Sequence, residues 1–383
     1  MDLLPFGSDL SENNIFSKLR RVEWGMWFVL LVLATYGTIL LYGAAGGSWQ
    51  PWALDHIVRF FLFSAIMFTV AVIDIRVWYQ LAYPAYIIVF VLLVGVELAG
   101  DISKGAQRWL QLGPLRLQPS EFMKITAVVA LARYYQDLNV KNIEKIKHHI
   151  IPILMVIAPA GLIMKQPDLG TGITVILVGG VMVVLAGISW RWITGAIVGA
   201  VGLFVFAYNF LLHDFQRKRV ETFLNPELDK LGQGYQITQS KIAIGSGGFW
   251  GSGFMHGTQS RLDFLPERHT DFVFAMLLEE FGFVGGILAL VLYAAVMAYG
   301  IYIATSSRNI FGKMVSGGVT MLLFIYVSIN AAMIMGLMPV VGMPMPFISY
   351  GGSVMLSVMF ALGLVQNAKV YRDKIINSGF AKK

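Results

Sequence analysis

Residues 265–282 read LPERHTDFVFAMLLEEFG, and in them a charged cluster meets a long apolar run that begins at Phe272. Ionisable residues at the entrance of a membrane span usually serve a function. We expect Asp271 in the first turn of a helix, where Thr270 can cap free backbone N–H groups and the helix dipole favours an ionised carboxylate. Asp271 is therefore a candidate base. The alternative is that Thr270 and Asp271 only cap a membrane helix, and this stretch alone leaves both interpretations open.

The composition indicates a polytopic membrane protein. Of the 383 residues, 57% are hydrophobic and only 13% are charged, whereas typical soluble domains contain about 25% charged residues. The 29 Lys and Arg exceed the 22 Asp and Glu, which fits the charge bias that orients membrane spans, and we expect no nucleic-acid partner. The sequence contains no Cys, which excludes a disulfide framework, a thiolate nucleophile and a Cys-based metal site.

The apolar runs predict an all-α polytopic membrane fold. About ten runs approach the length of about 20 residues that crosses a bilayer. Lys and Arg gather at alternate ends of these runs, so the positive-inside rule predicts an even number of spans with both termini in the cytoplasm. The predicted transmembrane helices are residues 25–42, 57–73, 81–99, 122–134, 150–164, 173–187, 192–212, 272–304, 314–336 and 347–365.

This topology divides the chain into a membrane domain and two tails. Residues 1–24 are expected to form a cytoplasmic tail without a cleavable signal, so the first span is retained as an anchor. Residues 25–370 are expected to form a single transmembrane domain, and residues 371–383 a second cytoplasmic tail. Between the seventh and eighth helices, residues 213–271 are predicted to form a large extracytoplasmic loop. This Gly-rich loop cannot build its own core and is expected to lie on the membrane domain over a cleft.

A second predicted outer connection reads DISKGAQRWLQLGPLRLQPSEFMK. Its cations Lys104, Arg108 and Arg116 lie where the positive-inside rule does not require them, which suggests an anionic ligand. Glu121 and Lys124 are three residues apart and share a helix face at membrane depth. They belong either to a ligand site or to a self-contained ion pair that stabilises the span.

Three further positions combine polar residues with interrupted helices. The connection KQPDLGTG contributes Lys165 and Asp168 between two short spans, and such spans often border a binding site. Ser349 and Tyr350, at the mouth of the last span, are interpreted either as a turn or as ligand contacts. The two glutamates at 279–280 need cations or hydrogen bonds in the membrane. The outer Lys and Arg are candidate partners for them, and packing support is the simpler interpretation.

Seven motifs resemble those of the SEDS family in order and spacing: KGAQRW, QPSEFMK, KQPDLGTG, GYQITQSKIAIGSGG, HGTQS, LPERHTDF and PFISYGGS. Together they cover most of the chain. The motif LPERHTDF, with Arg268, is similar to that of the elongation-type members, because the division-type members more often have Ala at this position. The polar start of the chain, residues 1–17, matches no family motif.

The resemblance implies a peptidoglycan glycosyltransferase in the bacterial cytoplasmic (inner) membrane. Such an enzyme polymerises lipid II into β-1,4-linked glycan strands on the outer face during cell elongation, with inversion at the anomeric carbon and undecaprenyl diphosphate as the leaving group. Asp271 is then the essential carboxylate and general base. The implied partners are a class B penicillin-binding protein, which is a transpeptidase, and the elongation-complex proteins MreC, MreD and RodZ.

One carboxylate base suffices for this reaction, because a diphosphate leaves without protonation when cations stabilise it. The candidate cations are Lys104, Arg108, Arg116, Lys124, Lys241 and Arg268, and a divalent cation, Mg or Mn, stays an alternative. No residue is assigned as a metal ligand. The full set of residues expected to bind substrate is Lys104, Arg108, Trp109, Arg116, Gln118, Ser120, Glu121, Lys124, Gln166, Asp168, Lys241, His256, Gln259, Glu267, Arg268, His269, Thr270, Ser349 and Tyr350.

Two other classes of protein fit part of the pattern. About ten spans with broken helices also describe a transporter or flippase for a lipid-linked sugar. However, the polar groups gather on the predicted outer side, whereas an alternating-access carrier needs polar groups that both faces can reach. The third interpretation is a scaffold that holds the transpeptidase, and this role can coexist with catalysis.

Overall fold

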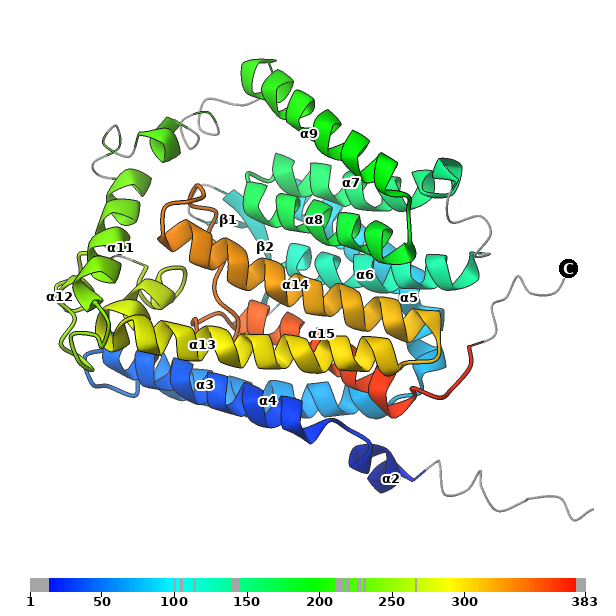
Figure 1. Ribbon diagram of the computed structural model, residues 1–383, viewed down its shortest axis with the longest axis horizontal. Helices are drawn as coiled ribbons and strands as arrows, with labels where there is room; N and C mark the ends of the chain where they lie inside the picture. The colour runs from blue at the N-terminus through cyan, green and yellow to red at the C-terminus, as the bar shows by residue number, and fades with distance from the viewer. Residues whose placement is uncertain are drawn as a thin grey trace, which may run out of the picture.

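The computed structural model describes residues 14–99, 101–103, 106–112, 115–138, 145–210, 217, 221–225, 227, 229, 232–265 and 267–376. Within them, ten helices of 16 to 34 residues follow the ten predicted runs. Most of them lie side by side along the long axis of the molecule, and α9 is inclined to the others (Figure 1). They are α3 (Trp24–Ala44), α4 (Ala53–Val72), α5 (Ile75–Ala99), α6 (Pro119–Asp137), α7 (Ile150–Lys165), α8 (Leu169–Ala186), α9 (Trp190–Phe210), α13 (Val273–Ser306), α14 (Ile310–Ile334) and α15 (Gly352–Val370).

The helices identify a multi-pass membrane protein, as the composition predicts. Among the described residues, seven helices are long and apolar enough to cross a membrane: α3, α4, α5, α8, α13, α14 and α15. Helix α7 is apolar but has only 16 residues. Helix α6 contains Glu121, Lys124 and Arg133, which make it less apolar than the other spans. The number of helices that cross the membrane therefore stays a prediction.

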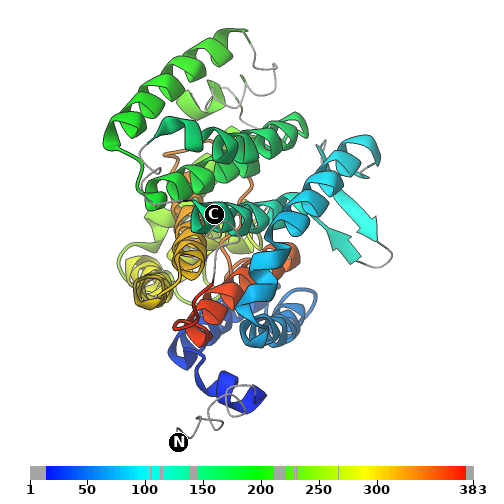
Figure 2. The same ribbon diagram turned by 90° about the vertical axis from the view of Figure 1, so that its right-hand side faces the viewer.

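A small antiparallel sheet lies between α5 and α6, which the all-α prediction did not include. It consists of β1 (Asp101–Ser103), β2 (Ala106–Leu112) and β3 (Leu115–Leu117), in the order β1-β2-β3. Figure 2 shows the strands projecting beside the end of α5. The sequence carries a signal for the second hairpin, because the turn dipeptide Gly-Pro stands between β2 and β3.

Helix ends converge on one side of the molecule and form the candidate site there. Helices α6, α8, α13 and α15 begin on this side, and α14 ends there. Local sequence fixes these starts: Pro119 occupies the first turn of α6, and the Asp168 carboxylate accepts a hydrogen bond from the Thr171 N–H as the cap of α8. Helix α13 packs along α14, and α15 packs along α4.

The two described ends of the chain meet on the opposite side of the molecule. The short helix α2 (Ile15–Arg20) brings the Lys18 ammonium within 5.5 Å of the Tyr371 ring centroid. Lys374 Nζ lies 2.5 Å from the Asp74 carboxylate in the connection between α4 and α5. Both ends therefore lie on the same side of the helix layer, as an even number of spans requires.

The described parts of the long loop lie on the membrane domain. Its helix α11 (Gln233–Gly247) packs against α13 and α14, and the single turn α12 (Thr258–Arg261) packs against α11 and α13. This arrangement matches the expectation for a segment without its own core. Among the described residues of the loop, those that line the cavity are Glu267, Thr270 and Asp271.

Candidate functional site

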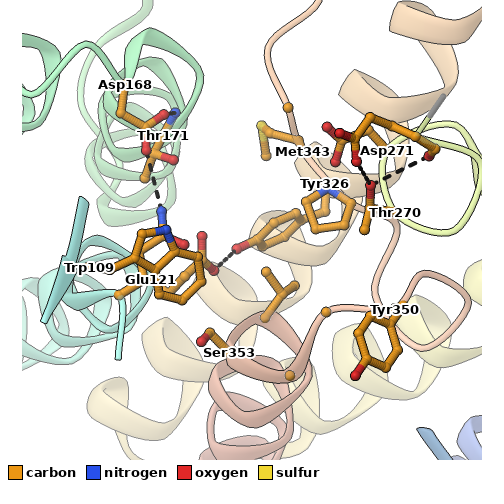
Figure 3. Close-up of a pocket in the computed structure, with 17 residues that line it drawn as sticks. Trp109, Glu121, Asp168, Thr171, Thr270, Asp271, Tyr326, Met343, Tyr350 and Ser353 are labelled. Carbon is orange, nitrogen blue, oxygen red and sulfur yellow. Dashed lines mark hydrogen bonds between the residues drawn. The ribbon is translucent and has the colours of Figure 1, made fainter. Parts of the chain in front are cut away.

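A polar cavity of about 390 Å³ lies where these helix ends converge. Figure 3 shows its lining residues, which come from β2, the starts of α6, α8 and α15, the turn before α13, the middle of α14 and the connection between α14 and α15. They are Trp109, Gln118, Glu121, Asp168, Thr171, Glu267, Thr270, Asp271, Tyr326, Gly342, Met343, Pro344, Tyr350, Gly351, Gly352, Ser353 and Val354.

Asp271 lines this cavity from a tight turn just before α13. Thr270 N–H and Phe272 N–H both donate to the Glu267 carbonyl, over 3.1 and 3.2 Å, and the Thr270 hydroxyl donates to the Glu267 carboxylate over 2.9 Å. The predicted capping role of Thr270 is wrong, because α13 starts at Val273 and its cap residue Phe272 makes no side-chain capping bond. Asp271 thus precedes the first helical turn. The Thr270 hydroxyl, which was predicted to cap the helix, donates its hydrogen bond to the Glu267 carboxylate instead.

Glu121 and Lys124 of α6 form a buried ion pair at the cavity wall. Lys124 Nζ lies 2.7 Å from the Glu121 carboxylate, and the two residues are 1% and 4% exposed. The Tyr326 hydroxyl accepts a hydrogen bond from Lys124 and donates to Glu121 over 2.5 Å. Glu121 and Tyr326 line the cavity, whereas Lys124 lies outside the lining. Glu121 and Lys124 thus have protein partners, and Glu121 faces the cavity, so the ligand-site interpretation stays a prediction.

Asp168 joins the starts of α8 and α6. Its two carboxylate oxygens accept hydrogen bonds from the Thr171 N–H over 3.3 Å and from the Gln118 side-chain amide over 3.4 Å. Asp168, Thr171 and Gln118 line the cavity together with Trp109 of β2 (Figure 3). Carboxylate, amide and indole side chains in one wall can contact both the hydroxyl groups and the faces of a sugar.

Tyr350 lines the cavity and contacts α4. Its N–H donates to the His269 carbonyl over 2.8 Å, and its hydroxyl donates to Asp55 over 3.2 Å. The His269 ring stacks on Trp52, with 4.3 Å between ring centroids, and lies outside the cavity lining. Arg59 of α4, which the sequence analysis did not single out, places its guanidinium 4.8 Å from the centroid of the Tyr350 ring. His269 thus supports the wall rather than forming it.

The described lining of the cavity is acidic, contrary to the prediction. It includes four carboxylates and no Lys, Arg or His among the residues whose side chains the structure describes. Arg268 instead donates to the carbonyls of Ala44 and Ser260 and pairs with Asp263, and burial lowers the pKa of its guanidinium. Lys241 packs against Gly336 at the end of α14. Among the described residues, no group of three or more His, Asp or Glu side chains is placed to hold a metal ion.

Two other predicted cations, Arg108 and Arg116, lie in the sheet. Lys104 lies outside the described residues, and the structure describes the backbones of Arg108 and Arg116 in β2 and β3 but not their side chains. Arg108 is the neighbour of Trp109, which lines the cavity, and Arg116 pairs with Gln111 across the two strands. By strand register, Arg116 therefore belongs to the same sheet face as Trp109, and Arg108 belongs to the opposite face.

Five other predicted contacts lie outside the cavity lining. Each of them contacts the protein elsewhere. Ser120 is buried in the first turn of α6, and the Gln166 amide donates a hydrogen bond to the Leu93 carbonyl. The Ser349 hydroxyl accepts a hydrogen bond from the Met345 N–H within a turn, the His256 ring contacts the Phe254 carbonyl, and the Gln259 N–H donates to Glu279. For Ser349, the structure selects the turn interpretation.

Glu279 finds backbone partners rather than the predicted cations. Its carboxylate accepts hydrogen bonds from the Gln259 N–H over 2.7 Å and the Ser260 N–H over 3.1 Å, and the Thr258 hydroxyl lies 3.4 Å away. Glu279 is completely buried. Glu279, in the first half of α13, therefore accepts hydrogen bonds from N–H groups of α12 that have no partner within that turn, and so connects the two helices. This contact agrees with the packing interpretation.

Several lining residues were not selected from the sequence. Tyr326 lies inside an apolar helix, where one tyrosine is an ordinary packing residue. Thr171, Met343, Pro344 and Ser353 carry no charge that would single them out. The sequence signal that could have identified these four residues is that they lie close to short or Gly-rich breaks between the apolar runs, because irregular backbone at membrane depth normally lines a cavity.

Residues 23–374 match the family described as "Cell cycle protein", which unites FtsW, RodA and SpoVE. The chain is 43% identical over 357 residues to "Peptidoglycan glycosyltransferase MrdB" of Escherichia coli K12, covering 92% of this chain and 95% of that protein. It is 36% identical over 354 residues to "Stage V sporulation protein E" of Bacillus subtilis 168, covering 90% and 95%.

Two solved structures share the fold. One comes from work described as "Structural coordination of polymerization and crosslinking by a peptidoglycan synthase complex", with a TM-score of 0.80, 32% identity, and coverage of 92% of this chain and 99% of that one. The other is the crystal structure of the rod shape determining protein RodA from Thermus thermophilus, with a TM-score of 0.66, 28% identity, and coverage of 92% and 97%. This chain therefore belongs to the SEDS family of FtsW, RodA and SpoVE proteins.

Proposed function

We propose that this protein is a peptidoglycan glycosyltransferase that polymerises lipid II, and that Asp271 is its general base. The observation that carries the proposal is the place of Asp271: it is the carboxylate next to α13 in the polar cavity of a membrane protein whose relatives include a peptidoglycan glycosyltransferase. A cavity at the ends of several spans is open to a substrate that is anchored in the membrane and carries a polar sugar head.

In the proposed reaction, the 4-hydroxyl oxygen of an acceptor GlcNAc attacks the anomeric carbon of the donor strand. The new C–O bond forms as the bond from this carbon to the diphosphate oxygen breaks, and undecaprenyl diphosphate leaves with the electron pair. The Asp271 carboxylate accepts the hydroxyl proton late in the step, and such base catalysis typically contributes about 10² to 10⁴ in rate. One displacement inverts the anomeric centre from α to β.

The acidic wall suggests how the two substrates are oriented. Glu121 is paired with Lys124, but the carboxylates of Asp271, Glu267 and Asp168 repel a diphosphate. The acceptor sugar, which is rich in hydroxyl groups, therefore fits against these three side chains. We assign the diphosphate to the sheet side, where Arg116 of β3 pairs with Gln111 and so belongs to the sheet face of Trp109, which lines the cavity. Arginine binds phosphate oxygens through two parallel N–H donors. Arg268 and Lys241 are not part of this assignment, because they pack elsewhere.

The cellular setting is part of the same proposal. The cavity side faces the outside of the cytoplasmic membrane, both termini lie in the cytoplasm, and residues 213–271 form the extracytoplasmic loop. A class B penicillin-binding protein is the proposed partner, because one related structure belongs to a complex that coordinates polymerization and crosslinking. The elongation proteins MreC, MreD and RodZ are proposed as further partners on the family resemblance alone.

The experiment compares polymerisation with transport. The chain is purified with its transpeptidase partner and supplied with labelled lipid II, first in detergent and then in sealed vesicles. The proposal expects polymer from the wild type and a rate about 10² to 10⁴ times lower from Asp271→Asn, with partner binding unchanged. Transport of lipid II across the vesicle membrane without any polymer would identify a flippase. If neither transport nor polymer were detected while partner binding stayed intact, the scaffold interpretation would be favoured.

A further inference from the structure

Asn330 connects the turn that carries Asp271 to a second segment of the cavity wall. It lies near the end of α14, one helical turn beyond Tyr326, and is completely buried. Its side-chain nitrogen Nδ2 donates one hydrogen bond to the Asp271 carbonyl over 2.9 Å and another to the Met343 carbonyl over 2.6 Å. Asp271 and Met343 both line the cavity, whereas Asn330 does not.

The two accepting segments are irregular, so this contact helps to decide where they lie. Asp271 precedes α13, and Met343 lies in the non-helical connection between α14 and α15. Backbone groups outside a helix or sheet need other partners when they are buried. A primary amide offers two N–H donors in a fixed geometry, and the Asn330 amide uses both of them. The rigid end of α14 thereby holds both irregular segments at once.

The acceptor side of the same amide shows that Asn330 is not simply a packing residue. Its oxygen Oδ1 is buried and has no hydrogen-bond partner among the described residues. Buried polar atoms nearly always have a partner, and one without a partner destabilises the fold. Leu has a similar size and would avoid this destabilisation. The two donated bonds are therefore the property that distinguishes Asn330 from an apolar residue at this position.

We propose that Asn330 is a positioning residue for the reaction, which acts through Asp271 and does not touch the substrate. By fixing the Asp271 carbonyl it sets the orientation in which the Asp271 carboxylate enters the cavity. The inference rests on the proposed function of Asp271 as the base. Displacement of a reacting group by about 1 Å can lower the rate by about 10²-fold, which sets the size of the expected effect.

The test uses Asn330→Leu in the complex of the full chain with its transpeptidase partner. This variant keeps the volume and removes both donated bonds together with the unpartnered oxygen. Ser316→Ala is the matched control, because Ser316 lies on the same helix, is completely buried and also carries a side-chain oxygen without a partner in the described part of the chain. We expect Asn330→Leu to lower kcat for lipid II polymerisation by about 10²-fold, with KM and partner binding close to wild type. Ser316→Ala should leave kcat unchanged.

A double-variant cycle separates positioning from general damage. If Asn330 acts through Asp271, its substitution lowers kcat much less in an Asp271→Glu background, where the carboxylate is already displaced. Asn330→Ser, which keeps one donor, should fall between wild type and Asn330→Leu and serves as the second variant if the leucine variant does not fold.

Three results would overturn the inference. The first is a kcat of Asn330→Leu equal to that of the wild type. The second is an equal loss of kcat in the wild-type and the Asp271→Glu backgrounds. The third is a loss of kcat that accompanies a lower melting temperature and weaker partner binding. The proposed function is judged separately by the Asp271→Asn arm. If Asp271→Asn polymerises lipid II at a rate close to wild type, the base assignment fails and this inference fails with it; if Asp271→Asn is slowed and Asn330→Leu is normal, only this inference fails.

Discussion

The Tyr326 hydroxyl donates to the Glu121 carboxylate over 2.5 Å and thereby joins α14 to α6 at the cavity wall. The same hydroxyl accepts a hydrogen bond from Lys124. Tyr326→Phe keeps the ring and removes both bonds. We expect the free energy of unfolding to fall by about 1.5–3 kcal/mol, the typical contribution of a hydrogen bond to a charged group, because Glu121 and Lys124 keep each other as partners. Polymerisation should fall far less than in Asp271→Asn. Denaturation in detergent and the lipid II assay measure the two effects, and an unchanged stability would contradict the role assigned to this hydroxyl.

The buried pair of Glu121 and Lys124 predicts a strong dependence on both partners. Lys124→Met leaves the Glu121 carboxylate buried without its cation, and breaking a buried pair in this way typically costs about 3–5 kcal/mol. The double variant Glu121→Gln, Lys124→Met removes both charges and should recover most of this loss. Thermal denaturation of the two variants checks the prediction. If the double variant were no more stable than Lys124→Met, the ion pair would not be the source of the effect.

The sequence predicts the positions of the helices well, but it does not predict where a helix is broken. The ten apolar runs predict the ten helices because run length and helix length reflect the same bilayer thickness. The break in α13 was not predicted: Gly282 has φ 65°, and a Cβ there would lie 2.3 Å from the Gly251 nitrogen. Ser252 and Gly253 donate to the carbonyls of Glu279 and Glu280 just before the break. Contacts from a distant loop create it, so the local sequence of the helix does not reveal it.

The same limit applies to the candidate site. The sequence identifies Asp271, Glu267, Glu121 and Asp168 as unusual because ionisable residues are rare at membrane depth, and all four line the cavity. It does not show which way a charged side chain points. Arg268, only three residues before Asp271, donates to the carbonyls of Ala44 and Ser260 and lies outside the cavity lining, although it was predicted to bind substrate.

The cap that Glu279 provides for α12 predicts a local effect outside the cavity. Glu279→Ala removes the acceptor for the N–H groups of Gln259 and Ser260. Loss of such a cap typically costs about 0.5–2 kcal/mol. Amide hydrogen exchange should therefore rise at residues 258–261 while exchange in α14 stays slow. An increase spread over the whole chain would instead indicate global destabilisation.

Asp74 predicts a pH dependence on the side of the molecule opposite the cavity. Burial raises the pKa of Asp74, but the hydrogen bond and charge of Lys374 and the backbone N–H of Arg76 lower it more, so the pKa lies below its usual 3.8. A depressed folded-state pKa stabilises the fold above the unfolded-state pKa, and this stability is lost as the pH falls through the folded value. Asp74→Asn should thus be less stable than wild type at pH 7, and the difference should shrink below about pH 4. Denaturation curves at several pH values measure it, and a constant difference would contradict the assignment.

The most direct test of the base assignment compares two aspartates at the end of the long loop. Asp271 lines the cavity, whereas Asp263 is exposed and pairs with Arg268. In the purified complex, Asp271→Asn is predicted to lower the rate of lipid II polymerisation by about 10² to 10⁴, and Asp263→Asn, which makes the same change of charge, is predicted to keep a rate close to wild type. Polymerisation by Asp271→Asn at the rate of Asp263→Asn would contradict the account.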